Sequence, residues 1–344
     1  MRKRVLFALV AVLLALTATI GNAAPPPNGP PGIDQAIAAQ EAHNPRLLGK
    51  PGVVGTAVGL TPDGRAAVKI FTETAGIAGL PDVLDGVPVA IEVTGKLVAM
   101  AGPPAEVAAK GNKPSGTSTT SWWSRPVPIG VSTGNANECA AGTIGARVVQ
   151  GTRVFALSNN HVYARENKAS IGETIAQPGL YDTGCSYKDQ DYLGRLEDFQ
   201  TLDFSGQPNY IDAAIASTTV YTLSNTTPGN GYGMPASSKV DPAIGLNVQK
   251  YGRTTGLTMG TITGINASVM VGYSTGTALF EKQIVVQSGK PFIKAGDSGS
   301  LLVTANSASN PVGLLFAGSS NGRLAIANDI GLVLSRFNVS IDGR

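Results

Sequence analysis

Residues 294–303 read Lys294-Ala295-Gly296-Asp297-Ser298-Gly299-Ser300-Leu301-Leu302-Val303. Glycines around a serine, just before an apolar strand, allow a tight turn and a close approach of a substrate backbone. The backbone N–H groups of Gly296 and Ser298 then point at one spot, where they stabilise a developing oxyanion. An ordinary glycine-serine turn between strands has the same pattern, so a nucleophilic Ser298 needs support from elsewhere in the chain.

A serine nucleophile needs a general base, and the chain has two histidines, His43 and His161. His161 ends the run Phe155-Ala156-Leu157-Ser158-Asn159-Asn160, in which an apolar strand gives way to a small polar turn. His43 lies in Glu-Ala-His-Asn-Pro, a context typical of a solvent-exposed histidine. We therefore predict His161 as the base. A hydrogen-bonded turn residue is the alternative interpretation of His161.

The base needs a carboxylate that fixes its tautomer and stabilises the imidazolium. Asp212 is the acidic residue of Asn209-Tyr210-Ile211-Asp212-Ala213-Ala214-Ile215-Ala216, which is otherwise mostly apolar and small. A buried carboxylate is costly unless it is paired. We predict Asp212 as the third member of a catalytic triad, with a surface residue at a strand edge as the alternative.

The order His161, Asp212, Ser298, with the motifs around each residue, resembles the trypsin-like (chymotrypsin-fold) serine peptidase family over roughly residues 122–344. The resemblance implies a mainly β protein of two six-stranded β-barrels with the triad between them and a C-terminal helix. It also implies a serine endopeptidase that works through an acyl-enzyme, with an oxyanion hole at Gly296 and Ser298. The sparse cysteines point to a bacterial-type exported member of the family.

Several positions depart from the pattern of digestive members. Alignment places Phe292, Phe316, Ala317 and Gly318 around the primary substrate pocket. Phe292 stands where an Arg- or Lys-specific member would carry aspartate, so we expect a preference for uncharged, apolar or small side chains before the cleaved bond. Phe316 stands where the family often has a serine bonded to the triad aspartate. The chain also lacks an Ile/Val-Val-Gly-Gly start, which argues against activation by a freed N-terminus near Asp297.

Two other functions were weighed against the endopeptidase. A catalytically weak or inactive peptidase-fold binding protein is the alternative that the Phe316 departure motivates, because fold does not imply function. An esterase of the α/β-hydrolase fold is excluded by the order of the triad, since that fold runs serine, acid, histidine.

Composition along the chain predicts four segments. Residues 1–23 carry Arg2-Lys3-Arg4 and then an apolar run, the layout of a secretory signal peptide, so we expect a secreted or periplasmic protein. An uncleaved membrane anchor is the alternative. Residues 24–101 predict a small α+β module, a candidate pro-region; residues 102–120, a linker rich in Pro, Ser, Thr and Gly; and residues 121–344, the peptidase domain.

Within the module we expect a helix over 35–43, capped by Asp34 and ended by Asn44-Pro45. Strands are expected over 53–60, 66–72 and 87–99. In the larger domain, short apolar runs at strand spacing favour a sandwich or barrels, followed by a helix over 329–337.

Charge and cysteine content limit the remaining functions. Removal of residues 1–23 would bring the formal charge of +3 to about zero, which gives no electrostatic footprint for nucleic acid. Cys139 and Cys185 predict a disulfide in an exported chain, with two free thiols as the alternative. Two cysteines and two histidines are too few for a zinc site. We expect no metal or cofactor, no membrane partner after signal cleavage, and a protein or peptide substrate.

Overall fold

The computed structural model describes residues 31–100 and 118–344. The expected signal peptide and most of the expected linker lie outside these residues. No helix in the described ranges is long and apolar enough to cross a membrane.

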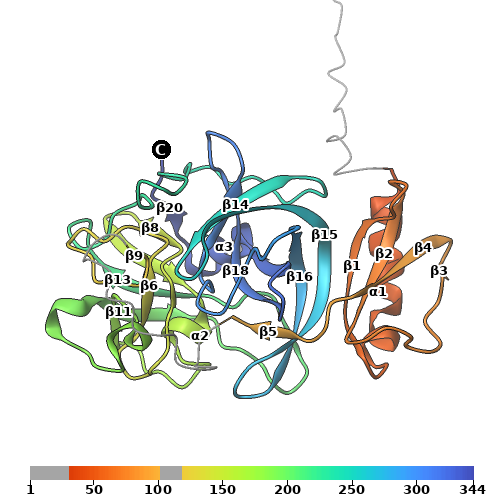
Figure 1. Cartoon of the computed structure of the whole chain (residues 1–344), viewed down its shortest axis with the longest axis horizontal. Helices are drawn as coiled ribbons and strands as arrows, with labels where there is room; N and C mark the ends of the chain where they lie inside the picture. The colour runs from red at the N-terminus through yellow and green to blue at the C-terminus, as the bar shows by residue number, and fades with distance from the viewer. Residues whose placement is uncertain (1–30, 101–117) are drawn as a thin grey trace, which may run out of the picture.

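The N-terminal module consists of one helix lying on a small sheet (Figure 1). Its elements are α1 (Ile33–Leu48), β1 (Val53–Leu60), β2 (Ala66–Thr72), β3 (Val83–Leu84) and β4 (Val87–Val93). The helix is longer than expected, because it begins after Gly32 rather than at an Asp34 cap and continues through Pro45. Tertiary contacts outweigh the proline: Leu47 is buried, and the Asn44 side chain donates to Ser268 Oγ.

The first barrel is built from six strands of the 8-stranded sheet, supplemented by two two-residue strands. Apolar residues on its strands fill the interior, as their alternation demands. The strands are β6 (Ser132–Asn135), β8 (Ala146–Gln150), β9 (Arg153–Ser158), β10 (Thr174–Ala176), β11 (Tyr192–Phe199) and β13 (Ala214–Thr218), with β7 (Gly142–Thr143) and β20 (Ser340–Ile341) at the edges. The short helices α2 (Asn160–Tyr163), η1 (Leu180–Thr183) and η2 (Asp189–Asp191) lie between them.

The second barrel is a closed ring of six strands, because β16 pairs with both β19 and β15. In order around the ring, the strands are β14 (Asn247–Gly252), β15 (Gly256–Gly272), β16 (Thr277–Gln287), β19 (Leu324–Asp329), β18 (Pro311–Ser319) and β17 (Leu301–Thr304). A further short strand, β12 (Pro208–Asn209), pairs with β16 outside the ring. The helix α3 (Ile330–Phe337) follows, and its N-cap Asp329 accepts hydrogen bonds from two backbone N–H groups. The fold is therefore the expected double β-barrel with a C-terminal helix.

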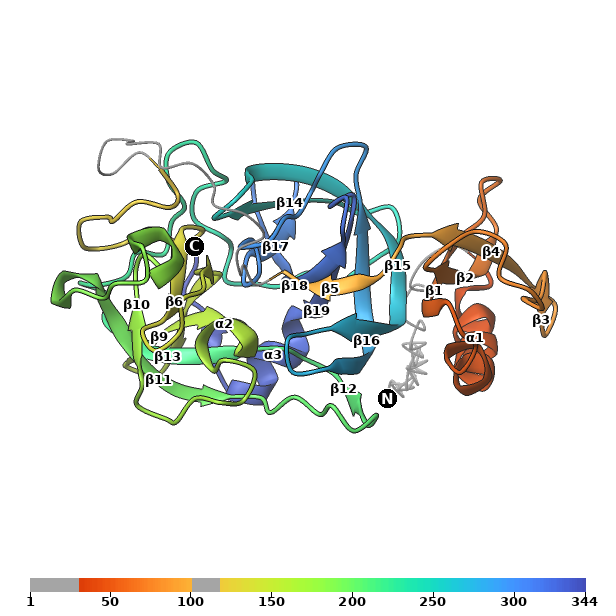
Figure 2. The ribbon, with the colours of Figure 1, turned by 60° about the horizontal axis from the view of Figure 1, so that its bottom comes forward.

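The module is joined to the second barrel by strand pairing as well as by the chain. β1 pairs antiparallel with β15, so the module's sheet continues the barrel's sheet (Figures 1 and 2). Gln40, fully buried on α1, donates to Thr56 Oγ1 and to the carbonyl of Asn266 on β15. A buried polar contact of this kind specifies one docking geometry, because any other leaves the amide unsatisfied.

The prediction of one continuous strand over 87–99 was wrong. The expected strand over 87–99 is broken after Val93, at Gly95, whose φ of +71° suits glycine. Its second part is a separate strand, β5 (Leu97–Ala99), which leaves the module and pairs with β18 and β15 of the second barrel.

The expected disulfide between Cys139 and Cys185 is present, with Cα atoms 5.0 Å apart. It links the segment before β7 to the turn after η1, within the first barrel. Because the two residues are 46 apart in sequence, the cross-link removes considerable freedom from the unfolded chain.

We expect the double variant Cys139→Ser/Cys185→Ser to lose about 4 kcal/mol of unfolding free energy. Urea denaturation of the variant and of the oxidised wild-type protein measures the difference. Identical midpoints, or two titratable thiols in denatured, unreduced wild-type protein, would contradict this expectation.

Candidate active site

His161 and Asp212 form a buried pair between the two barrels. His161 lies in the short helix α2, directly after β9, and Asp212 lies directly before β13, the neighbour of β9. Nδ1 of His161 bonds to Oδ2 of Asp212, and the backbone N–H of His161 donates to Oδ1 at 3.3 Å. Neither side chain is exposed to solvent. The carboxylate therefore fixes which ring nitrogen faces away from it.

The backbone of Asp212 is held from both barrels. Its carbonyl accepts from Asn159 Nδ2 at 2.7 Å and from Asn328 Nδ2 at 3.0 Å. Its N–H donates to Asn328 Oδ1 at 3.1 Å. Asn159 precedes α2 and Asn328 lies on β19, so the position of Asp212 depends on the way the barrels pack.

Tyr273, which the sequence interpretation missed, completes the carboxylate's surroundings. Its hydroxyl donates to Oδ2 of Asp212 at 2.9 Å, and its ring meets the His161 ring edge-on. Burial, and then the neighbouring Asp212 carboxylate, raise the pKa of Tyr273 well above its ordinary value, so the hydroxyl stays a donor. Phe316 has no side-chain group that could donate to Asp212, and Tyr273 donates to it instead.

The turn that carries Ser298 is held by Thr143 of the first barrel. Thr143 Oγ1 donates to the carbonyl of Gly296 at 2.8 Å, and its N–H donates to the carbonyl of Ser298 at 2.8 Å. Gly299 has φ +90°, and a Cβ there would lie 2.2 Å from Ser158 Oγ. Only glycine fits this contact between the barrels.

Gly142 lies close both to Val162, the neighbour of His161 in sequence, and to the backbone of Ser298. A Cβ at Gly142 would be 2.5 Å from Val162 Cγ2 and 3.1 Å from the carbonyl oxygen of Ser298. Ser298 Oγ donates to the carbonyl of Phe316 at 3.0 Å, and His161 Nε2 has no hydrogen-bond partner among the described residues. The Ser298 hydroxyl therefore bonds to the Phe316 carbonyl and makes no hydrogen bond to the imidazole.

Asp297, next to the nucleophile, forms a fully buried ion pair with Lys250 of β14, with 3.6 Å between Nζ and Oδ2. The same carboxylate accepts from the N–H groups of Thr254, Thr255 and Lys294, and from Thr255 Oγ1. Burial lowers the pKa of Lys250, and the charge of Asp297 opposes this shift. An internal lysine therefore occupies the place beside Asp297, and no freed N-terminus is needed to neutralise it.

The four residues expected around the substrate pocket divide into two groups. Phe292 belongs to the same buried apolar cluster as Met100 and Ile293, while Ala317 and Gly318 pair with β5. The Phe316 side chain instead packs on Phe280, with ring centroids 4.7 Å apart, in a different cluster that also contains Ala317. Phe316 therefore contributes its carbonyl oxygen rather than its ring to the site.

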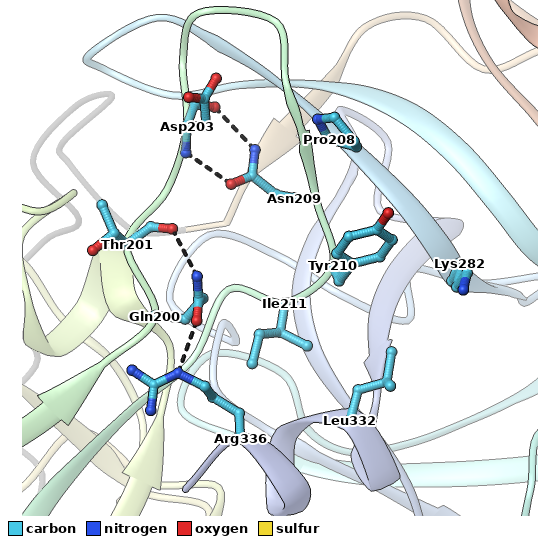
Figure 3. Close-up of a pocket in the computed structure, with 10 residues that line it drawn as sticks. All are labelled: Gln200, Thr201, Asp203, Pro208, Asn209, Tyr210, Ile211, Lys282, Leu332 and Arg336. Carbon is cyan, nitrogen blue, oxygen red and sulfur yellow. Dashed lines mark hydrogen bonds between the residues drawn. The ribbon is translucent and has the colours of Figure 1, made fainter.

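A separate cavity of about 480 Å³ lies between the β11–β13 connection and α3 (Figure 3). Tyr210, Ile211, Leu332 and Arg336 are among its lining residues, and it contains none of the three triad residues. Within the described ranges, no group of three or more His, Cys, Asp or Glu side chains is placed to hold a metal ion.

Comparisons with known proteins bear on part of the chain. A family model described as the Nal1 C-terminal domain matches residues 212–342. No curated protein matches the chain by sequence. Solved structures similar to the chain include a glutamic acid-specific serine protease (21% identity, TM-score 0.46, covering 62% of this chain and 100% of that one). Thermobifida fusca protease A is also similar, with 21% identity and a TM-score of 0.45 over 63% of this chain and 100% of that one. Nocardiopsis protease has 20% identity and a TM-score of 0.44 over 62% of this chain and 99% of that one.

We expect Lys250→Met to lower the free energy of unfolding by about 3 kcal/mol, because it leaves the buried Asp297 carboxylate without its cationic partner. We expect this loss of stability to lie at the lower end of the range for broken buried ion pairs, since Asp297 keeps its four hydrogen bonds. Lys239→Met is the matched control, because the Lys239–Asp241 pair is exposed and should cost less than about 1 kcal/mol. Equal losses in chemical denaturation would contradict this reasoning.

Proposed function

We propose that the protein is a serine endopeptidase that cleaves peptide bonds with Ser298 as nucleophile, His161 as general base and Asp212 as the residue that orients it. The observation that carries the proposal is the fully buried His161–Asp212 pair, set across one glycine from the Ser298 turn. A carboxylate bonded to one ring nitrogen of a histidine, with the other ring nitrogen free near a serine turn, is the arrangement that activates a serine nucleophile.

In the proposed mechanism Ser298 Oγ rotates from the Phe316 carbonyl to His161 Nε2, which takes its proton as the oxygen attacks the substrate carbonyl. The N–H groups of Gly296 and Ser298 bind the oxyanion. His161 then passes the proton to the leaving amine, and water releases the acyl group by the same steps in reverse. Asp212, held by Tyr273, stabilises the imidazolium throughout.

A non-catalytic binding protein with this fold is the second candidate. The orientation of the Ser298 hydroxyl toward Phe316 rather than His161 favours it. The two candidates differ in a simple assay: a fluorophosphonate probe modifies an activated serine and leaves an inert one untouched.

We expect Ser298→Ala and His161→Ala each to reduce kcat/KM by roughly four orders of magnitude, because the triad acts as a unit. The measurement is hydrolysis of a fluorogenic peptide library with uncharged residues before the cleavable bond. His43→Ala is the matched control, because His43 bonds to Asp85 in the module and should leave the rate unchanged. Undiminished hydrolysis by Ser298→Ala would exclude the proposed nucleophile.

We expect Tyr273→Phe to lower kcat by roughly tenfold to a hundredfold, the value of one hydrogen bond to a buried carboxylate. KM should stay unchanged, since Tyr273 contacts Asp212 and not the substrate. Tyr221→Phe, at a side chain that is 83% exposed, is the control. A change confined to KM, or to stability, would show that Tyr273 does not act through the triad.

A further inference from the structure

The hairpin loop that joins β15 to β16 brings Tyr273 to the Asp212 carboxylate. Gly272 and Thr277 are the last paired residues of the two strands, so the loop consists of residues 273–276. Figure 2 shows this end of the hairpin beside α2 of the first barrel, where the loop makes its hydrogen bonds. The position of the Tyr273 hydroxyl therefore depends on where the loop is held.

One side chain of the first barrel holds the loop at its two central residues. Glu166, which follows α2, accepts from the Ser274 N–H at 3.1 Å, from Ser274 Oγ at 2.7 Å and from the Thr275 N–H at 2.8 Å. Thr275 Oγ1 donates to the same carboxylate. Among the described residues, the hydrogen bonds from this loop to other parts of the chain go to Glu166 and Asp212. Glu166 thus supports the segment that carries Tyr273.

The Glu166 carboxylate is held in its charged form. Burial raises its pKa, but the hydrogen bonds from Thr275 and Ser274 together outweigh this, so the pKa lies below the ordinary value for glutamate. Lys168 Nζ is 3.8 Å away on a side chain that is 53% exposed, and such a surface pair contributes little. The loop is therefore held mainly by hydrogen bonds to a charged acceptor, which are stronger than bonds between neutral groups.

The backbone around Glu166 adopts a conformation that residues with side chains disfavour. Arg165, Glu166 and Asn167 have φ of +51°, +53° and +72°, so three successive residues lie in the left-handed region. Residues other than glycine enter this region rarely, and then as single residues. Strain of this kind persists where the surroundings impose it, and it clusters at functional sites. The strained turn is therefore a reason to look for a role of Glu166 beyond folding.

The strained turn is also fixed to the helix that carries the base. Asn167 Oδ1 accepts from Asn160 Nδ2 at 2.8 Å, and the Asn167 N–H donates to Asn160 Oδ1 at 3.2 Å. Asn160 directly precedes His161 in α2. The turn is thus joined on one side to the helix of His161 and, through Glu166, on the other side to the hairpin of Tyr273.

We propose that Glu166 is a positioning residue for the proposed reaction: by holding residues 274 and 275, it keeps the Tyr273 hydroxyl on Oδ2 of Asp212. Through that bond it adjusts how strongly the carboxylate binds His161. The expected effect on turnover rests on the proposed function, whereas the effect on the placement of Tyr273 does not.

This chain of contacts predicts a definite change at His161. Nδ1 of His161 and the Tyr273 hydroxyl both bond to Oδ2 of Asp212. Because the two donors share one oxygen, weakening the bond from Tyr273 strengthens the bond from His161. A stronger hydrogen bond deshields its proton. Displacement of Tyr273 should therefore move the Nδ1 proton of His161 downfield in proton NMR spectra.

The first test measures this resonance in Glu166→Ala and Tyr273→Phe. All proteins carry His43→Ala, which leaves His161 as the one histidine of the chain. We expect both variants to shift the resonance downfield, Glu166→Ala by no more than Tyr273→Phe. Asp203→Ala is the matched control, because its carboxylate also accepts N–H and O–H hydrogen bonds but within its own loop. Its resonance should equal that of the parent protein.

The second test measures kcat and KM on the fluorogenic peptides. We expect Glu166→Ala to lower kcat roughly tenfold with KM unchanged. The double variant Glu166→Ala/Tyr273→Phe should be no slower than Tyr273→Phe alone, because both changes act on one contact. Glu166→Gln, whose amide oxygen still accepts from Thr275, should lose less than about threefold. Thr275→Val removes one donor and leaves the strained turn intact, so it lowers kcat in the same direction and replaces Glu166→Ala if that variant does not fold.

The outcomes separate this inference from the proposed function. A folded Glu166→Ala variant with the parent resonance, or with the parent kcat in an active protein, overturns the inference and leaves the endopeptidase standing. Losses of kcat that multiply in the double variant, or a glutamine variant as slow as the alanine variant, also overturn it. A wild-type chain that neither hydrolyses peptides nor takes up a fluorophosphonate overturns the proposed function, and the resonance then still decides whether Glu166 positions Tyr273.

Discussion

The buried carboxylate of Asp297 is the constraint on which the active-site region depends. A charge with no solvent contact must be satisfied by the protein, and here Lys250 and four hydrogen-bond donors surround it. These partners come from β14, the turn after it and the nucleophile loop itself. Because Asp297 lies between Gly296 and Ser298, fixing its carboxylate also fixes the N–H of one neighbour and the hydroxyl-bearing residue on the other side. An ion pair on the far side of the turn from the Ser298 hydroxyl thus fixes the turn that carries Ser298.

The candidate site also requires the two barrels to bring the His161–Asp212 pair and the Ser298 turn close together. Thr143 of the first barrel holds the carbonyls of the Ser298 turn, and Asn328 of the second holds the backbone of Asp212. Arg253 after β14 adds a bidentate bond to Asp182 in η1. Contacts therefore run in both directions across the interface, and each barrel holds a part of the candidate site that the other carries. A shift between the barrels would move the His161–Asp212 pair relative to the Ser298 turn rather than deform either one.

Local periodicity predicted a sandwich or barrels and the C-terminal helix, and a simple cysteine count predicted the disulfide. The double barrel itself was implied by the family resemblance. The sequence also singled out Asp212, whose charge in an apolar strand region has few explanations. It missed Tyr273 and Lys250, since a tyrosine after a glycine and a lysine in an alternating strand look like surface residues until the strands are paired. The predicted end of α1 was wrong for a related reason. The helix continues beyond Pro45 because Asn44 and Leu47 make contacts with residues distant in sequence.

The break in the expected strand over 87–99 transfers its second part from the module to the second barrel, and local pattern could not have placed it. Leu97-Val98-Ala99-Met100 alternates no better as part of β4 than as a separate strand, and only its pairing with β18 distinguishes the two. β18 extends beyond its pairing with β17, which reaches only to Leu314, so without β5 its last residues would present unpaired backbone groups to any extended peptide. A segment that covers these groups protects them from other chains. The contacts that distinguish β5 from a continuation of β4 therefore join residues far apart in sequence, which local pattern cannot reveal.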